Sequence, residues 1–163
     1  MAREAADVDT VELPAALEPL AFLLGTWTGV GRGSYPTIED FAYSEETTFV
    51  YPGKPVLAYS QRSRVPPGGA PSHAEVGYLR PAPVGAELVL AHPSGIVEVS
   101  QGTIRDTRLE LATLHVVTTP TAKAVTDVRR VYERLGDVLW YQIDMAAVGQ
   151  PLGFHLEAEL HLT

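Results

Sequence analysis

The sequence predicts an all-β protein, a closed antiparallel barrel of about ten strands with a short helix over one end. Two observations lead to this prediction. Short β-like runs alternate with turn residues from residue 25 onward, and one apolar helical stripe precedes them. An antiparallel sheet of about ten strands in one domain is too wide to stay open, so a closed barrel or a sandwich is expected.

The length of the chain favours a single domain. A chain of 163 residues can bury one full hydrophobic core and is short for two. Residues 1–12 are acidic and show no hydrophobic periodicity, so we expect a disordered arm there. Residues 13–163 are then one barrel domain. The sequence shows no internal repeat, linker or low-complexity tract.

Composition excludes several function classes. The chain has no cysteine, which removes disulfides, thiolate metal sites and cysteine nucleophiles, and fits a reducing compartment. Its 12 Lys and Arg stand against 20 Asp and Glu, and a net charge of −8 argues against nucleic acid as a partner. The charged N-terminus is unlike a signal peptide, and no apolar run reaches roughly 18 residues. We therefore expect a cytoplasmic protein with no membrane partner.

The predicted helix runs from Pro14, a residue suited to a first helical turn, to Gly25. Its apolar positions recur at spacings of three and four and are Leu17, Leu20, Ala21 and Leu24. A helix of two or three turns is not stable alone, so its apolar stripe must pack on the neighbouring strands. We expect it to close one end of the barrel.

The first predicted strand, residues 25–33, has an unusual face. Period-2 spacing places Gly25, Trp27, Gly29 and Gly31 together on it. Glycines on one face of a strand indicate a sharp bend or the close approach of another backbone or a ligand. Trp27 is expected to be structural and to fill the closed end of the barrel, provided that its N–H finds a partner.

The remaining predicted strands are separated by turns rich in Pro and Gly. They are residues 47–51, 56–61, 73–79, 88–91, 96–99, 109–117, 122–132, 138–147 and 155–162. Gly136-Asp137 is predicted to form a hairpin turn between two of them. A barrel of this size leaves room for a small ligand.

The residues alone offer few candidates for chemistry. The five histidines include no pair at the i, i+4 spacing of a helical zinc site. His155 and His161 share a strand face but lie about 20 Å apart along it, so they cannot bind one ion. No serine lies in a strand-turn-helix elbow, and the glycines of residues 25–33 precede no helix, so hydrolase and dinucleotide motifs are absent.

Residues 25–31, Gly-Thr-Trp-Thr-Gly-Val-Gly, resemble the GxWxGxG motif of the nitrobindin family, whose haem-binding barrel also occurs as the C-terminal domain of certain THAP-type proteins. Further segments resemble the family in the same order, and together they cover nearly everything after the N-terminal arm. They are residues 34–38, 45–46, 53–56, 73–78, 91–95, 145–152 and 155–156. GxW alone is weak, since lipocalins and fatty-acid-binding proteins share something similar.

The resemblance implies a ten-stranded barrel holding one haem b per subunit, with His155 as the axial iron ligand. It also implies nitric oxide binding at the iron and isomerisation of peroxynitrite to nitrate. Ferric iron with one histidine and an open position is suited to this reaction as a Lewis acid. No catalytic side chain is therefore expected beyond the ligand.

Strand parity argues against this role for His155. In residues 154–162 the apolar side chains occupy even positions, whereas His155 shares a face with Glu157, Glu159 and His161. Strict alternation turns it away from the core. Either residues 150–153, which precede it, hold a turn or bulge that re-aims it, or the haem lies across the rim and meets this face.

Other haem contacts follow from the same resemblance. Lys123 corresponds to a family lysine suited to a haem edge or propionate, Thr37 lies in a loop at the expected mouth, and His73 is placed above the distal face. Each has an ordinary alternative: an exposed lysine, a turn threonine or a loop-end histidine. The remaining histidines are assigned to the surface or the core and are His92, His115 and His161.

Two other functions remain open from the sequence. One is a haem-free carrier of a fatty acid or another apolar ligand, which needs cationic or Tyr side chains deep in the cavity. The interior positions read as mainly apolar, with no inward Arg pair. The other is a haem-based nitric oxide sensor or carrier with the same iron site. Both have small-molecule partners, and either a monomer or a homodimer is compatible with the sequence.

Overall fold

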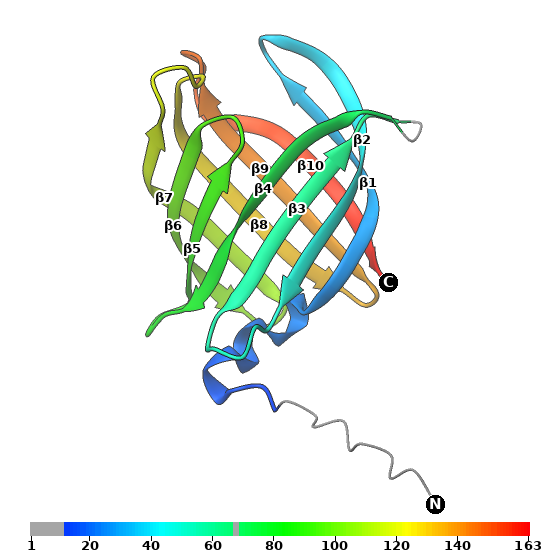
Figure 1. Cartoon of the computed structure of the whole chain (residues 1–163), viewed down its shortest axis with the longest axis vertical. Helices are drawn as coiled ribbons and strands as arrows, with labels where there is room; N and C mark the ends of the chain where they lie inside the picture. The colour runs from blue at the N-terminus through cyan, green and yellow to red at the C-terminus, as the bar shows by residue number, and fades with distance from the viewer. Residues whose placement is uncertain (1–11, 67–68) are drawn as a thin grey trace, which may run out of the picture.

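The computed structural model describes residues 12–66 and 69–163 and shows a closed antiparallel barrel of ten strands (Figure 1). Each strand pairs with its neighbours in the chain, and the first pairs with the last to close the barrel. This confirms the predicted fold class. The expected arm falls outside the described residues except for Glu12. The elements are η1 Ala15–Leu23, β1 Gly25–Tyr35, β2 Ile38–Val50, β3 Leu57–Arg64, β4 Pro71–Pro81, β5 Ala86–His92, β6 Ile96–Arg105, β7 Arg108–Thr118, β8 Val125–Leu135, β9 Val138–Ala147 and β10 Gly153–Leu162.

The N-terminal helix differs from the prediction in its type. It is a 3₁₀-helix with Pro19 inside it, and its fully buried residues are Leu17, Leu20 and Leu23. Proline lacks the N–H of an α-helical hydrogen bond and restricts the residue before it. A 3₁₀-helix has three residues per turn, so residues i, i+3 and i+6 lie on one face. The buried face therefore contains Leu23 and not the predicted Ala21 and Leu24.

The helix η1 covers one end of the barrel, the lower end in Figure 1, and Trp27 packs in the same apolar core as the leucines of η1. The Trp27 side chain is fully buried, and its indole N–H donates to the carbonyl of Leu23 at 2.8 Å. The indole thus has the partner that a buried Trp needs. The helix and the first strand are fixed to each other by this bond, and the closed end is filled with apolar side chains.

Two glycines of β1 make room for aromatic rings from the adjacent strand. A Cβ atom on Gly31 would collide with the ring of Tyr43, and one on Gly33 would collide with the ring of Phe41. Gly29 instead lies against the backbone carbonyl of Glu159. The glycine-rich face is therefore a place of close approach, and the two rings reach the barrel interior because β1 lacks side chains there.

The hairpin predicted at Gly136-Asp137 is present between β8 and β9. Leu135 pairs with Val138, which leaves a two-residue loop, and Gly136 has a φ of 63°. Glycine adopts this conformation without the steric cost that other residues carry. This turn lies at the closed end, whereas the loops after β1, β3, β5, β7 and β9 surround the opposite end, the mouth.

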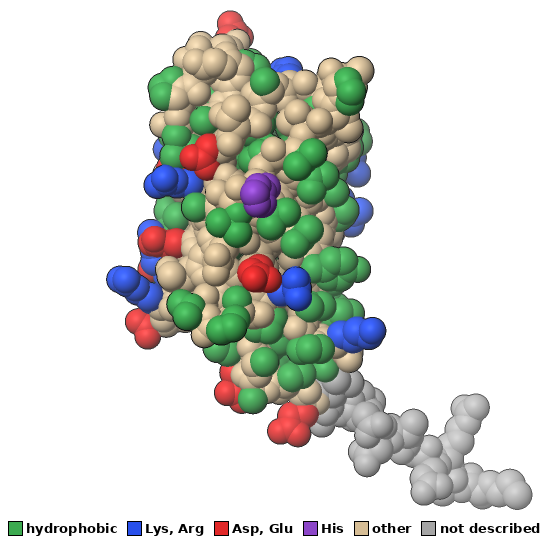
Figure 2. Space-filling model, turned by 90° about the vertical axis from the view of Figure 1, so that its left-hand side faces the viewer, with side chains coloured by type: hydrophobic (Ala, Val, Ile, Leu, Met, Phe, Trp, Pro, Cys, Tyr) green, Lys and Arg blue, Asp and Glu red, His purple; other side chains and the backbone are tan. Residues whose placement is uncertain are grey.

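The outer wall of the barrel mixes side-chain types. On the face seen in Figure 2, acidic, basic and hydrophobic side chains are interspersed. Several large apolar residues on the outer strands are exposed, among them Val30, Val76 and Val117. Within the described part of the chain, no helix has the length and apolar character needed to cross a bilayer.

We predict that Trp27→Phe lowers the free energy of unfolding by about 1–3 kcal/mol, because it shrinks a fully packed side chain and leaves the Leu23 carbonyl without its donor. Urea denaturation followed by circular dichroism measures this loss. Trp140→Phe is the matched control, because Trp140 is a partly exposed residue of β9. It should change stability by less than about 0.5 kcal/mol. Equal losses in both variants would contradict the role of Trp27.

Candidate functional site

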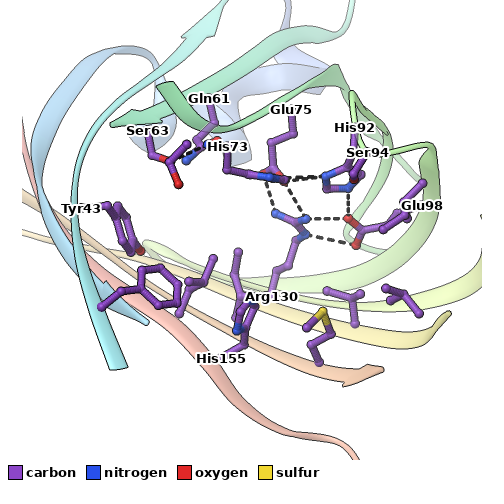
Figure 3. A pocket seen from close by; sticks show the side chains of 18 residues that line it. Tyr43, Gln61, Ser63, His73, Glu75, His92, Ser94, Glu98, Arg130 and His155 are labelled. Atoms are coloured by element: carbon purple, nitrogen blue, oxygen red, sulfur yellow. Dashed lines mark hydrogen bonds and ion pairs between the residues drawn. The ribbon is translucent and has the colours of Figure 1, made fainter. Parts of the chain in front are cut away.

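A cavity of about 280 Å³ lies at the mouth of the barrel, opposite η1. Its 18 lining residues come from β2–β6, from β8–β10 and from Ser94 in the β5–β6 loop (Figure 3). One part of the wall is apolar and includes Phe41, Met145 and Leu156. Another part carries histidines and buried charges. The cavity therefore has an apolar surface beside a polar wall.

His155 lines this cavity because β10 contains a bulge. Phe154 pairs with Asp144 and Leu156 pairs with Ile143 on β9, so His155 is an extra residue in the strand. This extra residue interrupts the inward–outward alternation of side chains along β10, so both His155 and Leu156 line the cavity. A bulge thus re-aims His155, as in the first of the two alternatives, but it lies at His155 within β10 and not in residues 150–153.

The imidazole of His155 is held in one orientation and one tautomer. Its Nδ1 lies 3.3 Å from the backbone carbonyl oxygen of Ser34. A carbonyl only accepts, so Nδ1 carries the hydrogen and Nε2 keeps its lone pair. The ring of Tyr35 packs edge-on at 5.3 Å between centroids, and that of Phe41 at 6.4 Å.

Burial lowers the pKa of His155, an effect that the Ser34 hydrogen bond partly offsets and the nearby His73 reinforces. The group is therefore neutral at pH 7. A neutral imidazole with a free Nε2 and a hydrogen-bonded Nδ1 is the form in which histidine binds transition metals and haem iron. His155 has the chemistry of an axial ligand.

An ion network lies deeper in the polar wall and centres on Arg130. Its guanidinium donates to Glu75 at 2.7 and 3.0 Å and to Glu98 at 2.6 and 3.3 Å. All three side chains are less than 5% exposed. Burial alone would raise the pKa of both carboxyls. The charge of Arg130 and hydrogen bonds outweigh burial, so the pKa of Glu75 is well below its ordinary value and the pKa of Glu98 is lowered. Both carboxylates are ionised.

Two histidines extend this network toward the cavity (Figure 3). His92 Nε2 donates to Glu98 at 2.5 Å, and His92 Nδ1 lies 3.3 Å from His73 Nε2. His73 Nε2 is also 3.4 Å from Glu75. The assignment of His92 to the surface or the core was incomplete, because this buried side chain is part of the cavity wall.

A third buried carboxylate, Glu45, lies beside a pair of tyrosines. It accepts from Thr47 Oγ1 at 2.6 Å and from the Tyr141 hydroxyl, which in turn is 2.7 Å from that of Tyr43. Burial raises the pKa of Glu45, and no ion pair of residues 12–66 and 69–163 includes it. The interior of the described barrel is mainly apolar, as expected, but it also contains buried carboxylates and Arg130, which the sequence analysis did not predict.

The structure brings together two of the four expected cofactor contacts. His155 and His73 line the same cavity, on opposite walls in Figure 3. Thr37 lies in the turn between β1 and β2, and Lys123 lies between β7 and β8. Both are exposed residues of the mouth loops and do not line the cavity. The exposed His115 and His161 lie outside it, as expected.

Sequence reasoning missed the charged wall, although strand parity contained a signal for it. His92 shares a face of β5 with the buried Leu88 and Leu90. Arg130 shares a face of β8 with the buried Val128 and Tyr132. A charged residue on the same face of a barrel strand as buried apolar residues points into the barrel.

Comparison with known proteins agrees with this fold and cavity. Residues 16–161 match the family model of the THAP4-like, heme-binding beta-barrel domain. The chain belongs to this family.

Relatives in the family are similar over almost their whole length. The chain is 51% identical over 158 residues to peroxynitrite isomerase 2 of Mycobacterium avium, covering 91% of this chain and 98% of the relative. It is 46% identical over 156 residues to the peroxynitrite isomerase of Nocardia farcinica, with 93% of each covered. The crystal structure of Rv2717c from M. tuberculosis superposes with a TM-score of 0.84 at 46% identity, covering 93% of this chain and 99% of that one.

We predict that Arg130→Met destabilises the protein by about 3–5 kcal/mol, because Glu75 and Glu98 then stay buried without a counter-charge. Chemical denaturation measures the change. Arg129→Met is the control, since this neighbour is exposed on the outer face of β8. A similar small loss in both variants would show that the buried network contributes little.

Glu45→Gln is predicted to make stability less dependent on pH. A carboxyl whose pKa rises on folding binds its proton more tightly in the folded protein, so its contribution to stability falls as pH rises above its ordinary value of 4.5. The amide cannot ionise, and the variant should gain stability over the parent as pH increases. Urea denaturation between about pH 5 and 8 measures the difference. The partly exposed pair Glu46 and Arg62 supplies the control Glu46→Gln, which should leave the pH profile unchanged.

Proposed function

We propose that this chain holds one haem b with His155 as the axial ligand and isomerises peroxynitrite to nitrate. The observation that carries the proposal is the bulge at His155, which aims a neutral imidazole with a free Nε2 into the cavity. Parity without the bulge would send this side chain to solvent. Membership of a haem-binding family and the names of the relatives support the same assignment.

Two features of the chain favour non-covalent haem b. There is no cysteine, so the thioether bonds of a c-type haem cannot form. Phe41, Met145 and Leu156 give an apolar wall for a porphyrin face. Since about 280 Å³ is small for an enclosed ligand, a bound haem would need space in the mouth as well as in the cavity. We assign Thr37 and Lys123 there as partners of the propionates.

The residues of the chain position and protect the reacting centre. The Ser34 carbonyl and the rings of Tyr35 and Phe41 fix the plane of His155. The Tyr35 hydroxyl accepts the Ala147 N–H at 2.8 Å and so joins β1 to the end of β9 beside the cavity. When bound, ferric haem would supply a Lewis acid for this reaction and a binding site for nitric oxide. His73 lies on the cavity wall opposite His155 and would face a haem bound between them.

A fatty-acid carrier fits the interior poorly. Arg130 is the one buried cationic side chain in the described part of the chain, and two ionised carboxylates already neutralise it. A ligand carboxylate would find no free positive charge and would approach Glu75 and Glu98. The hydroxyl of Tyr43, a tyrosine of the cavity wall, is already hydrogen-bonded to that of Tyr141 at 2.7 Å. A nitric oxide sensor would use the same iron site, so only turnover separates it from an isomerase.

We predict that hemin added to the purified chain gives one equivalent of a histidine-bound ferric species, seen as a shifted Soret band. His155→Ala should weaken hemin binding by at least about 10–100-fold, the loss that even outer-shell changes at metal ligands cause. His161→Ala is the matched control, because His161 is an exposed residue of β10, and this variant should bind hemin as the parent does. Undiminished hemin binding in His155→Ala would refute the axial assignment.

Stopped-flow decay of peroxynitrite tests the reaction itself. The hemin-loaded chain should accelerate the decay beyond free hemin at equal concentration and yield nitrate as the product. Loss of this excess in His155→Ala, with His161→Ala unaffected, is the expected pattern. A rate no higher than that of free hemin would instead favour a sensor or carrier.

A further inference from the structure

Three potential ligand atoms form a nearly equilateral triangle in the polar wall of the cavity. His73 Nε2 and His92 Nδ1 are 3.3 Å apart, and each lies 3.4 Å from Glu75 Oε2. These are the one group of three His, Asp or Glu side chains among the described residues that could hold a metal ion. His155 is not part of the group.

The size of this triangle matches one coordination geometry. Ligands of a tetrahedral ion lie about 1.6 times the metal–ligand distance apart, so zinc ligands at about 2.0–2.1 Å are about 3.3–3.4 Å from each other. Adjacent ligands of an octahedral Mg²⁺ at the same distance would be only about 2.9 Å apart, and that ion prefers oxygen. We propose that His73, Glu75 and His92 bind a divalent transition-metal ion, with Zn²⁺ the best match.

The surrounding residues prepare the ligand atoms for a cation. Glu98 accepts from His92 Nε2, so the lone pair of His92 lies on Nδ1, the corner of the triangle. Arg130 fixes the carboxylate of Glu75 through two hydrogen bonds. A carboxylate bonded to the far nitrogen of a metal-binding histidine is the usual outer-shell arrangement.

Hydrogen bonding alone explains the triangle poorly. Its edges of 3.3 and 3.4 Å exceed the usual 2.9–3.0 Å, whereas contacts just behind it are short: 2.5 Å from His92 to Glu98 and 2.6 Å from Arg130 to Glu98. In the triangle, three potential ligand atoms face one another. A central ion would satisfy all three at once.

The charges of the buried network and its access to the cavity also favour a bound cation. Glu75 and Glu98 carry two negative charges against one on Arg130, and all three are nearly fully buried. A divalent ion would offset this excess. Three protein ligands leave one tetrahedral position for water or a small anion from the cavity, as in catalytic rather than structural zinc sites. The site would therefore be an open one facing the same cavity as His155.

Co²⁺ titration of the full chain, stripped of metal with a chelator, tests the proposal without haem. One Co²⁺ per chain with the intense visible bands of four-coordinate cobalt is expected, and Zn²⁺ should displace it. His92→Gln and His73→Gln should each weaken binding at least about 10-fold. His73 is partly exposed, so the second variant tests the site if the first fails to fold.

Two controls separate this site from others. His115→Gln removes an exposed histidine of β7 and should bind Co²⁺ as the parent does. His155→Ala should also keep full Co²⁺ binding, so this proposal can hold even if the haem assignment fails. Weak six-coordinate spectra, or equal affinity in the parent and both glutamine variants, would overturn it.

Discussion

Closure of the sheet by the β1–β10 pair is the constraint on which the rest of the structure depends. In a closed barrel every second side chain enters one enclosed space, and each must pack, bond or leave a cavity there. Near η1 the space is filled by leucines and Trp27. Toward the mouth, the glycines of β1 admit the rings of Tyr43 and Phe41, and polar side chains replace leucines. The cavity lies where that replacement begins.

The fold could be predicted because its signals are local. Turn residues divide the chain into ten runs, and that number of strands favours a closed barrel or a sandwich over an open sheet. The helix type was missed because spacing of three and four fits an α-helix, whereas the position of Pro19 decides between the two forms. Strand ends at the mouth were also longer than their apolar runs, since β2 begins at Ile38 and not near Thr47. Polar residues continue a strand when neighbouring strands supply its hydrogen bonds.

The site was less accessible to sequence reasoning, and His155 and His92 show why. Parity alone turned His155 outward, and only the pairing of Phe154 and Leu156 with β9 reveals the bulge that reverses this. Family resemblance pointed to His155 as a candidate ligand where periodicity did not. His92 is the opposite case, because its parity with Leu88 and Leu90 was readable and still says nothing about Glu98, which follows a turn. Contacts between strands are not encoded in the period of either strand.

The described barrel interior contains three buried carboxyl groups and one buried guanidinium. The carboxyl groups respond to this excess in different ways. Glu45 has no cationic partner among the described ion pairs, so burial raises its pKa and favours the neutral form. Glu75 and Glu98 stay ionised because Arg130 lies between them, yet one guanidinium cannot balance two carboxylates. Burying uncompensated charge is costly, so a cation at Glu75 would complete the balance. The same excess of acid disfavours a carboxylate ligand and leaves the apolar wall beside His155 for a flat, largely apolar group.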